Sequence, residues 1–71
     1  MPDKHYVQSS NVEAVGYEAD EMALHVWFIS GAHYVYRDVP EDLFHELLAA
    51  DSVGSFLHRN VKATYDYEKI E

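Results

Sequence analysis

The 71-residue chain contains no cysteine and no long run of apolar residues. Without cysteine it can form neither a disulfide nor a thiolate metal site, which fits a reducing compartment. No apolar stretch approaches the roughly 20 residues that a membrane-spanning helix needs, and residues 1–10 lack the apolar region of a secretory signal. The sequence therefore predicts a cytoplasmic protein without a membrane partner.

Basic residues are also scarce. Only five lysines and arginines stand against thirteen acidic residues, which gives a formal net charge of −8. Proteins that bind nucleic acid usually carry a basic surface, so this balance argues against general phosphate binding. Three of the bases, Arg59, Lys62 and Lys69, lie late in the chain. Arg59 and Lys62 are candidates for phosphate contacts, or else they are solvated charges at the end of a helix.

Aromatic residues, in contrast, are frequent: six Tyr, three Phe and one Trp. A chain this short buries only about 60% of the surface that its unfolded form exposes, so its stability requires dense packing or self-association. The aromatic side chains favour dense packing in one small domain. We expect a flexible N-terminal segment over residues 1–10 and a single domain over residues 11–71.

Three segments have the composition of β-strands. Each is rich in β-branched or aromatic residues, or alternates apolar with small or polar residues. Gly16, inside the first segment, indicates either a close approach of another backbone or a β-bulge. The segments are residues 12–19, 23–30 and 33–38.

Two helices and a tail follow the strands. Leu43, Phe44, Leu47 and Leu48 recur at helical spacing after Pro40, with Asp38 as the expected N-cap. Asp51 or Ser52 is expected to cap a second short helix. The tail, residues 62–70, forms either an extra C-terminal edge strand or extended coil. The predicted fold is thus α+β, a three-stranded antiparallel meander followed by two short helices.

The loop between the second and third predicted strands decides which side chains face the core. A two-residue turn at Ser30-Gly31 places Tyr34 and Tyr36 on the face of Trp27. A three-residue loop, with Gly31 in a left-handed conformation, places them instead with the large apolar residues of the preceding strand. A slip of one residue exchanges the two faces, so the alternatives are exclusive.

We prefer the three-residue loop, because it gathers the apolar residues and both tyrosines on one side. The predicted core is then Val15, Tyr17, Leu24, Val26, Phe28, Tyr34, Tyr36, Leu43, Phe44, Leu47, Val53, Phe56 and Leu57.

Several runs of this chain together resemble the KTSC domain, a short bacterial module named for its occurrence at the C-terminus of some lysyl-tRNA synthetases. The resemblance extends from about Tyr6 to Tyr67, and its hallmark is the pair Tyr34-x-Tyr36. The runs are SSNV, VGY, ALHVWF, GAHYVYRDVP and ADSVGSFLHRNVK, with further matches at Val39-Pro40, Ala50, Ser52, Gly54 and Lys62. No synthetase sequence accompanies them, so we expect a free-standing form. The resemblance implies RNA binding only through the association with synthetases.

The opposite face of the predicted hairpin is the candidate ligand face. It carries Trp27 opposite His33, with His25 and Arg37 nearby, and RNA-binding sheets use such aromatic and cationic groups to stack bases. Together with Lys62, these residues form the candidate RNA site. Alternatively, the tail or a second copy of the chain covers this face, since exposed apolar patches favour partners.

Catalytic and metal sites are not expected. The five histidines lack the spacing of metal ligands, and no serine lies in a nucleophile motif. We therefore predict a non-enzymatic protein without a cofactor. Its expected role is either an RNA-binding accessory module, related to tRNA, or a module for protein–protein interaction or self-association.

Overall fold

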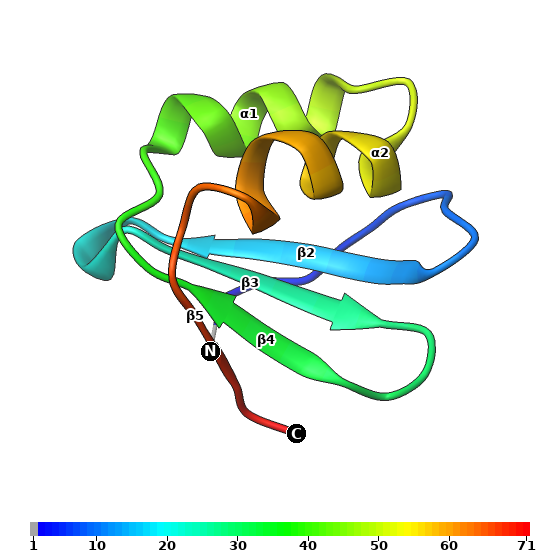
Figure 1. Cartoon of the computed structure of the whole chain (residues 1–71), viewed down its shortest axis with the longest axis horizontal. Helices are drawn as coiled ribbons and strands as arrows, with labels where there is room; N and C mark the ends of the chain where they lie inside the picture. Colours follow the sequence, from blue (N-terminus) through cyan, green and yellow to red (C-terminus); the bar gives the residue numbers. More distant parts are fainter. Residues whose placement is uncertain (1) are drawn as a thin grey trace.

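In the computed structural model, which describes residues 2–71, the chain forms one antiparallel sheet with two helices on one face (Figure 1). The helices are α1 (Glu41–Ala49) and α2 (Val53–Leu57), and α2 continues into a π-helical turn, η2 (His58–Lys62). A short 3-10 turn, η1 (Ala19–Glu21), joins the second strand to the third. In the order in which they lie across the sheet, the strands are β1 (His5–Tyr6), β2 (Val12–Glu18), β3 (Ala23–Phe28), β4 (His33–Tyr36) and β5 (Tyr67–Lys69).

The α+β class is as predicted, but the sheet has five strands. The sequence predicted three strands and left undecided whether the C-terminal tail forms a fourth. The tail does supply an edge strand, since Tyr67 pairs with Tyr36. The additional strand β1 comes from the predicted N-terminal segment, where His5 pairs with Val15. Two residues are too few to show an alternating pattern, and β1 forms only because β2 offers its free edge for pairing.

The hairpin between β3 and β4 has the three-residue loop that the core argument favoured. The Phe28 N–H donates to the Ala32 carbonyl at 2.8 Å, and Gly31 has a φ of +100°. Residues with a side chain avoid this left-handed conformation, whereas glycine adopts it freely. The register that follows pairs Leu24 with Tyr36 and Val26 with Tyr34.

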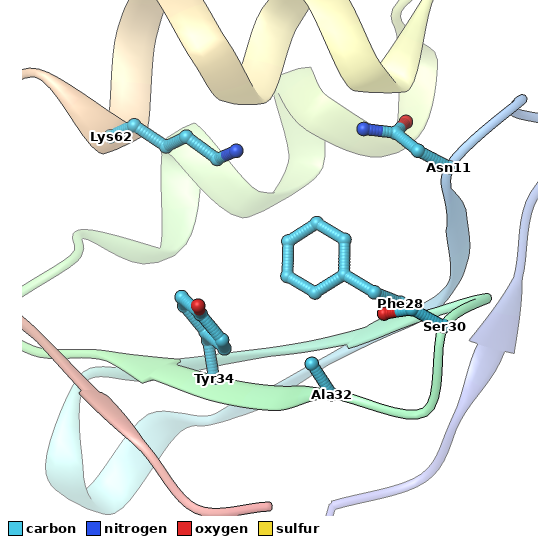
Figure 2. A pocket seen from close by; sticks show the side chains of 6 residues that line it. All are labelled: Asn11, Phe28, Ser30, Ala32, Tyr34 and Lys62. Atoms are coloured by element: carbon cyan, nitrogen blue, oxygen red, sulfur yellow. The ribbon is translucent and has the colours of Figure 1, made fainter.

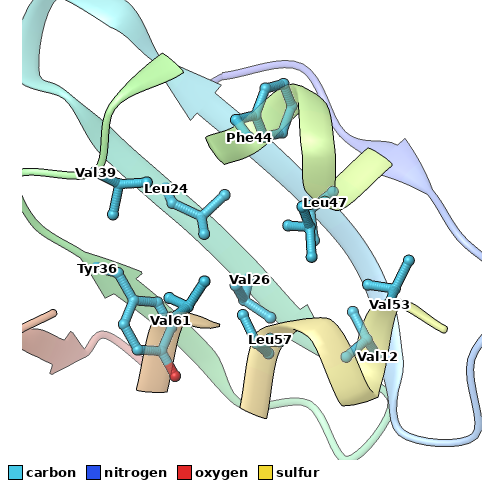
Figure 3. Packing of buried hydrophobic residues seen from close by; sticks show 11 residues of the cluster. Val12, Leu24, Val26, Tyr36, Val39, Phe44, Leu47, Val53, Leu57 and Val61 are labelled. Atoms are coloured by element: carbon cyan, nitrogen blue, oxygen red, sulfur yellow. The ribbon is translucent and has the colours of Figure 1, made fainter. Parts of the chain in front are cut away.

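The core lies between the sheet and the helices (Figure 3). Most of the predicted core is buried, and five of its members, including Phe28 and Tyr34, are half-buried against it. The prediction missed three valines. Val12 begins β2, Val39 lies in a connection without periodicity, and Val61 keeps the helical spacing of α2 within η2, although the predicted core did not include it. The buried cluster is Val12, Val15, Leu24, Val26, Tyr36, Val39, Phe44, Leu47, Val53, Leu57 and Val61.

The predicted N-cap of the first helix is wrong. Pro40 occupies that position, with no side-chain hydrogen bond, and α1 begins at Glu41. Asp38 instead has a φ of +61°, a left-handed conformation that aspartate tolerates better than most residues. The second helix is capped by Ser52, one of the two predicted residues, whose Oγ accepts from the Ser55 N–H at 3.3 Å.

Candidate functional site

The candidate ligand face is closed in the folded chain. Trp27 lies opposite His33 in the register, as predicted, and both belong to the outer face, the side of the sheet away from the helices. Yet Trp27 is only 8% exposed, His25 5% and His33 1%. A base cannot stack on a ring that other atoms already cover, so this face is not an open binding surface.

The N-terminal segment provides the cover. Residues 2–4 cross the outer face next to Gly16, where an added Cβ would lie 2.6 Å from the Asp3 carbonyl oxygen. The Lys4 ammonium lies 5.0 Å from the centre of the Trp27 ring, close enough for a cation–π contact. The close backbone approach that Gly16 indicated is therefore present, and the β-bulge lies elsewhere, between Val12 and Ala14.

On the same outer face, three side chains from neighbouring strands form a hydrogen-bonded chain. Glu18 Oε1 lies 2.6 Å from His25 Nε2, and His25 Nδ1 lies 2.9 Å from His33 Nε2. Burial is the main cause that lowers the pKa of His33, and the nearby His25 lowers it further. Among the described residues, no group hydrogen-bonds to His33 Nδ1, although this atom is buried.

The remaining two predicted site residues lie apart from this chain. Arg37, at the margin of the outer face, donates to Glu68 at 2.8 Å and to Glu21 at 3.3 Å, so its charge is already paired. Lys62 lies in η2, on the helix-bearing side of the sheet. The five predicted residues therefore do not gather at one open site.

An open pocket instead lies on the helix-bearing side, with a volume of about 260 Å³. Figure 2 shows the Lys62 ammonium and the Asn11 side chain pointing toward each other from opposite sides, with the Phe28 ring between them. The ammonium lies 5.4 Å from the centre of that ring, and no carboxylate among residues 2–71 forms an ion pair with it. The pocket is lined by Asn11, Phe28, Ser30, Ala32, Tyr34 and Lys62.

Three aromatic rings continue from the pocket toward the edge of the sheet, and we call Phe28, Tyr34 and Tyr67 the aromatic platform. Tyr34 packs edge-on against Phe28, with ring centres 5.3 Å apart, and stacks on Tyr67 at 5.2 Å with an interplanar angle of 8°. Tyr67 is 56% exposed, whereas Phe28 and Tyr34 are half-buried. The neighbouring Tyr36 is buried, and burial, with Tyr34 and Tyr67 nearby, raises its pKa to about 12.

The sequence singled out Tyr34 and Lys62, but it did not predict that both side chains line the same pocket. It assigned Tyr34 to the core and Lys62 to the outer face. One signal for the platform was present, because Tyr67 belongs to the alternating tail. The pairing of that tail with β4, which places Tyr67 beside Tyr34, could not be read from the alternation alone.

Two features, a metal-binding cluster and a membrane-spanning helix, are absent from residues 2–71. No group of three or more His, Asp or Glu side chains there is arranged to hold a metal ion. Within the same range, no helix has the length and apolar character required to cross a bilayer.

The comparisons with known proteins agree on one family. A sequence model described as the KTSC domain matches residues 8–65. A protein from Tsukamurella paurometabola is 44% identical over 59 residues, covering 83% of this chain and 88% of that protein. An uncharacterized protein from Stutzerimonas stutzeri is 38% identical over 66 residues, covering 92% of this chain and 93% of that protein.

Two further similarities concern an enzyme and a solved structure. A lysine–tRNA ligase from Nostoc sp. is 33% identical over 63 residues, which are 89% of this chain but only 11% of the ligase. The crystal structure of a KTSC domain protein from Yersinia pestis superposes with a TM-score of 0.94 at 28% identity, over the full length of both chains.

Proposed function

This chain belongs to the KTSC domain family, and from that premise we propose that it is a non-enzymatic RNA-binding module. The aromatic platform carries the proposal, together with the Lys62 ammonium beside it, which forms no ion pair with the carboxylates of residues 2–71. A similar segment in a lysine–tRNA ligase, an enzyme whose name joins it to tRNA, supports RNA over other anionic ligands.

The arrangement of the platform supports binding of single-stranded RNA in particular. Unstacked bases stack on aromatic side chains, while cations beside the rings contact the backbone phosphates. Tyr67 offers an exposed ring, and Phe28 and Tyr34 extend the apolar surface to the pocket. The pocket lining includes no carboxylate or imidazole, so its polar groups suit binding better than acid–base catalysis.

The local charge differs from the charge of the whole chain. The last twenty residues contain three bases and three acids, so the deficit of −8 comes from the rest of the sequence. Lys69 pairs with Tyr34 across β4 and β5 and therefore shares the face of the platform. The last twenty residues, which supply Lys62, Tyr67 and Lys69 to the proposed RNA surface, thus carry no formal net charge.

RNA binding should be weakened by changes on the platform. We expect Tyr67→Ala to weaken binding of a fluorescein-labelled single-stranded RNA roughly 5-fold or more, because one stacked base contributes about 1–3 kcal/mol. Lys62→Gln should weaken it further and reduce the slope of log affinity against log salt by about 0.7, since one phosphate contact is lost. Fluorescence anisotropy at low and raised salt measures both effects.

Matched controls are available on the outer face. Tyr6→Ala removes a tyrosine from β1 that is even more exposed than Tyr67, and Lys4→Gln removes the same charge as the Lys62 change. Both should leave the affinity for RNA unchanged, and bound RNA should not quench the buried Trp27. Absence of binding at low salt, or equal losses from platform and control variants, would contradict the proposal.

Self-association is the second candidate, supported by the edge strand β5. Tyr67 and Ile70 are 56% and 49% exposed at this edge, and the unpaired side of an edge strand can accept a strand from another chain. We expect the mean mass in sedimentation equilibrium to rise with concentration, and Ile70→Lys to suppress the rise. A constant monomer mass at every concentration would rule this candidate out.

A further inference from the structure

The Glu18–His25–His33 chain has only one place to accept a proton. An ionised carboxylate only accepts hydrogen bonds, so His25 Nε2 carries the proton that is shared with Glu18. Because neutral His25 then has a bare Nδ1, the 2.9 Å contact is donated by the Nε2–H of His33, and Nδ1 of neutral His33 carries no proton. An additional proton must therefore reside on His33 Nδ1, the one ring nitrogen of the pair that has no hydrogen-bond partner among residues 2–71.

A proton on His33 Nδ1 is costly while the outer face remains covered. The nitrogen is buried, so the new N–H would be an unsatisfied donor next to a buried positive charge. Lys4 on the covering segment repels that charge, and Glu71 at the chain end attracts it. Glu18 attracts it through His25, whereas Arg37 and Glu68 largely neutralise each other at the margin.

The covering segment, residues 2–4, is attached so that it can leave the outer face without unfolding of the core. Residues 2–4 lie directly over Gly16 and Trp27, and they are joined to the sheet through the two-residue strand β1. Such a short strand contributes few hydrogen bonds, so its release costs little compared with unfolding of the core. If the segment leaves, the Lys4 charge that disfavours a proton on His33 is removed, and the Trp27 ring, which stacks on His33 with ring centres 4.7 Å apart, is uncovered.

We propose that the Glu18–His25–His33 chain is a proton-operated latch, which holds residues 2–4 over the outer face when neutral and releases them when His33 is protonated. Release exposes Trp27 without opening the helix-bearing side of the sheet. The latch is therefore independent of RNA binding at the aromatic platform.

The direction of the pH dependence follows from the environment of His33. Because its pKa is lowered in the folded, covered state, the open and unfolded states bind the proton more tightly. The covered state is therefore favoured above the ordinary histidine pKa of about 6.5 and is progressively lost as the pH falls below it.

Acidification should expose Trp27 before the domain unfolds. We expect acrylamide quenching of Trp27 fluorescence to rise several-fold as the pH falls from about 7.5 to about 5, while the far-UV circular dichroism stays constant. His33→Gln should abolish the rise, since glutamine can still donate to His25 but does not titrate. Gly16→Ala should give high quenching already at neutral pH, because its Cβ displaces the Asp3 carbonyl.

The matched control is His45→Gln, which makes the same substitution at an exposed site on α1 and should retain the rise of the unmodified chain. Long-range proton–nitrogen spectra of the unmodified chain test the latch without any substitution, and they should show a bare Nδ1 on His33 at neutral pH. The proposal is overturned if acrylamide quenching of Trp27 stays constant with pH, or if it rises only together with a loss of circular dichroism. A rise that persists in His33→Gln would also overturn it. So would spectra that show a proton on His33 Nδ1 at neutral pH.

Discussion

Replacing Tyr36 with alanine is expected to lower the free energy of unfolding by about 3 kcal/mol or more, the cost of deleting a large buried aromatic ring. Tyr36 is 1% exposed and points into the layer between the sheet and the helices (Figure 3). Its loss leaves a cavity that Leu24 and Val61, held in regular elements, fill only in part. Urea unfolding followed by circular dichroism measures the change.

Tyr6→Ala is the matched control for this substitution. Tyr6 is 70% exposed on β1, so the same deletion there should cost less than about 1 kcal/mol. A loss below about 1 kcal/mol for Tyr36→Ala itself would mean that the ring lies at the surface, and the observed hairpin register would then be wrong.

The Tyr36 hydroxyl adds a pH signature to the same experiment. Because the pKa of Tyr36 is raised from 10.0 to about 12, the folded state holds the phenol proton more tightly than the unfolded chain. This contribution to stability is complete below the unfolded pKa and is lost as the pH rises toward the folded pKa. Tyr36→Phe removes the titrating group and should lose less stability over that interval.

Replacing Leu47 with alanine is expected to destabilise the domain by about 2–5 kcal/mol, the range for a buried leucine. Leu47 is fully buried on the face of α1 that packs on the sheet, so truncation removes contacts with the core cluster. A domain of this size has only about 3–5 kcal/mol to lose, so the variant should retain little of its stability at room temperature. Thermal and urea unfolding measure the loss.

Leu48→Ala provides a control one residue away. Leu48 is 36% exposed, so the identical substitution should change the stability by less than about 1 kcal/mol. Equal effects at the two positions would show that α1 does not pack on the sheet with the observed face.

The two faces of the sheet have separate chemistry. The helix-bearing side carries the aromatic platform and Lys62, whereas the outer side carries the buried histidine chain and, over Gly16 and Trp27, residues 2–4. Lys62→Gln and His33→Gln therefore test different proposals. A failure of RNA binding leaves the latch intact, and constant Trp27 quenching leaves the RNA surface intact.

Much of the sheet was predictable from local pattern. Gly31 and the large apolar residues of β3 selected the hairpin register, because only that register gathers Phe28, Tyr34 and Tyr36 on one face. The candidate site was less predictable. The alternation that places Trp27 and His33 on the outer face gives no information on what covers that face, and the cover comes from residues 2–4, which have no periodicity of their own.

By itself, the sequence determined the α+β class, the paired tyrosines of β4, the central hairpin and most of the buried core, because alternation, helical spacing and turn chemistry are local. Only the tertiary structure decided which surface remains open. It brought Lys62 over Phe28, laid Tyr67 against Tyr34 and closed the N-terminal segment over Trp27. These contacts join residues 23 or more positions apart, and no local pattern specifies where distant segments meet when the chain buries its apolar surface.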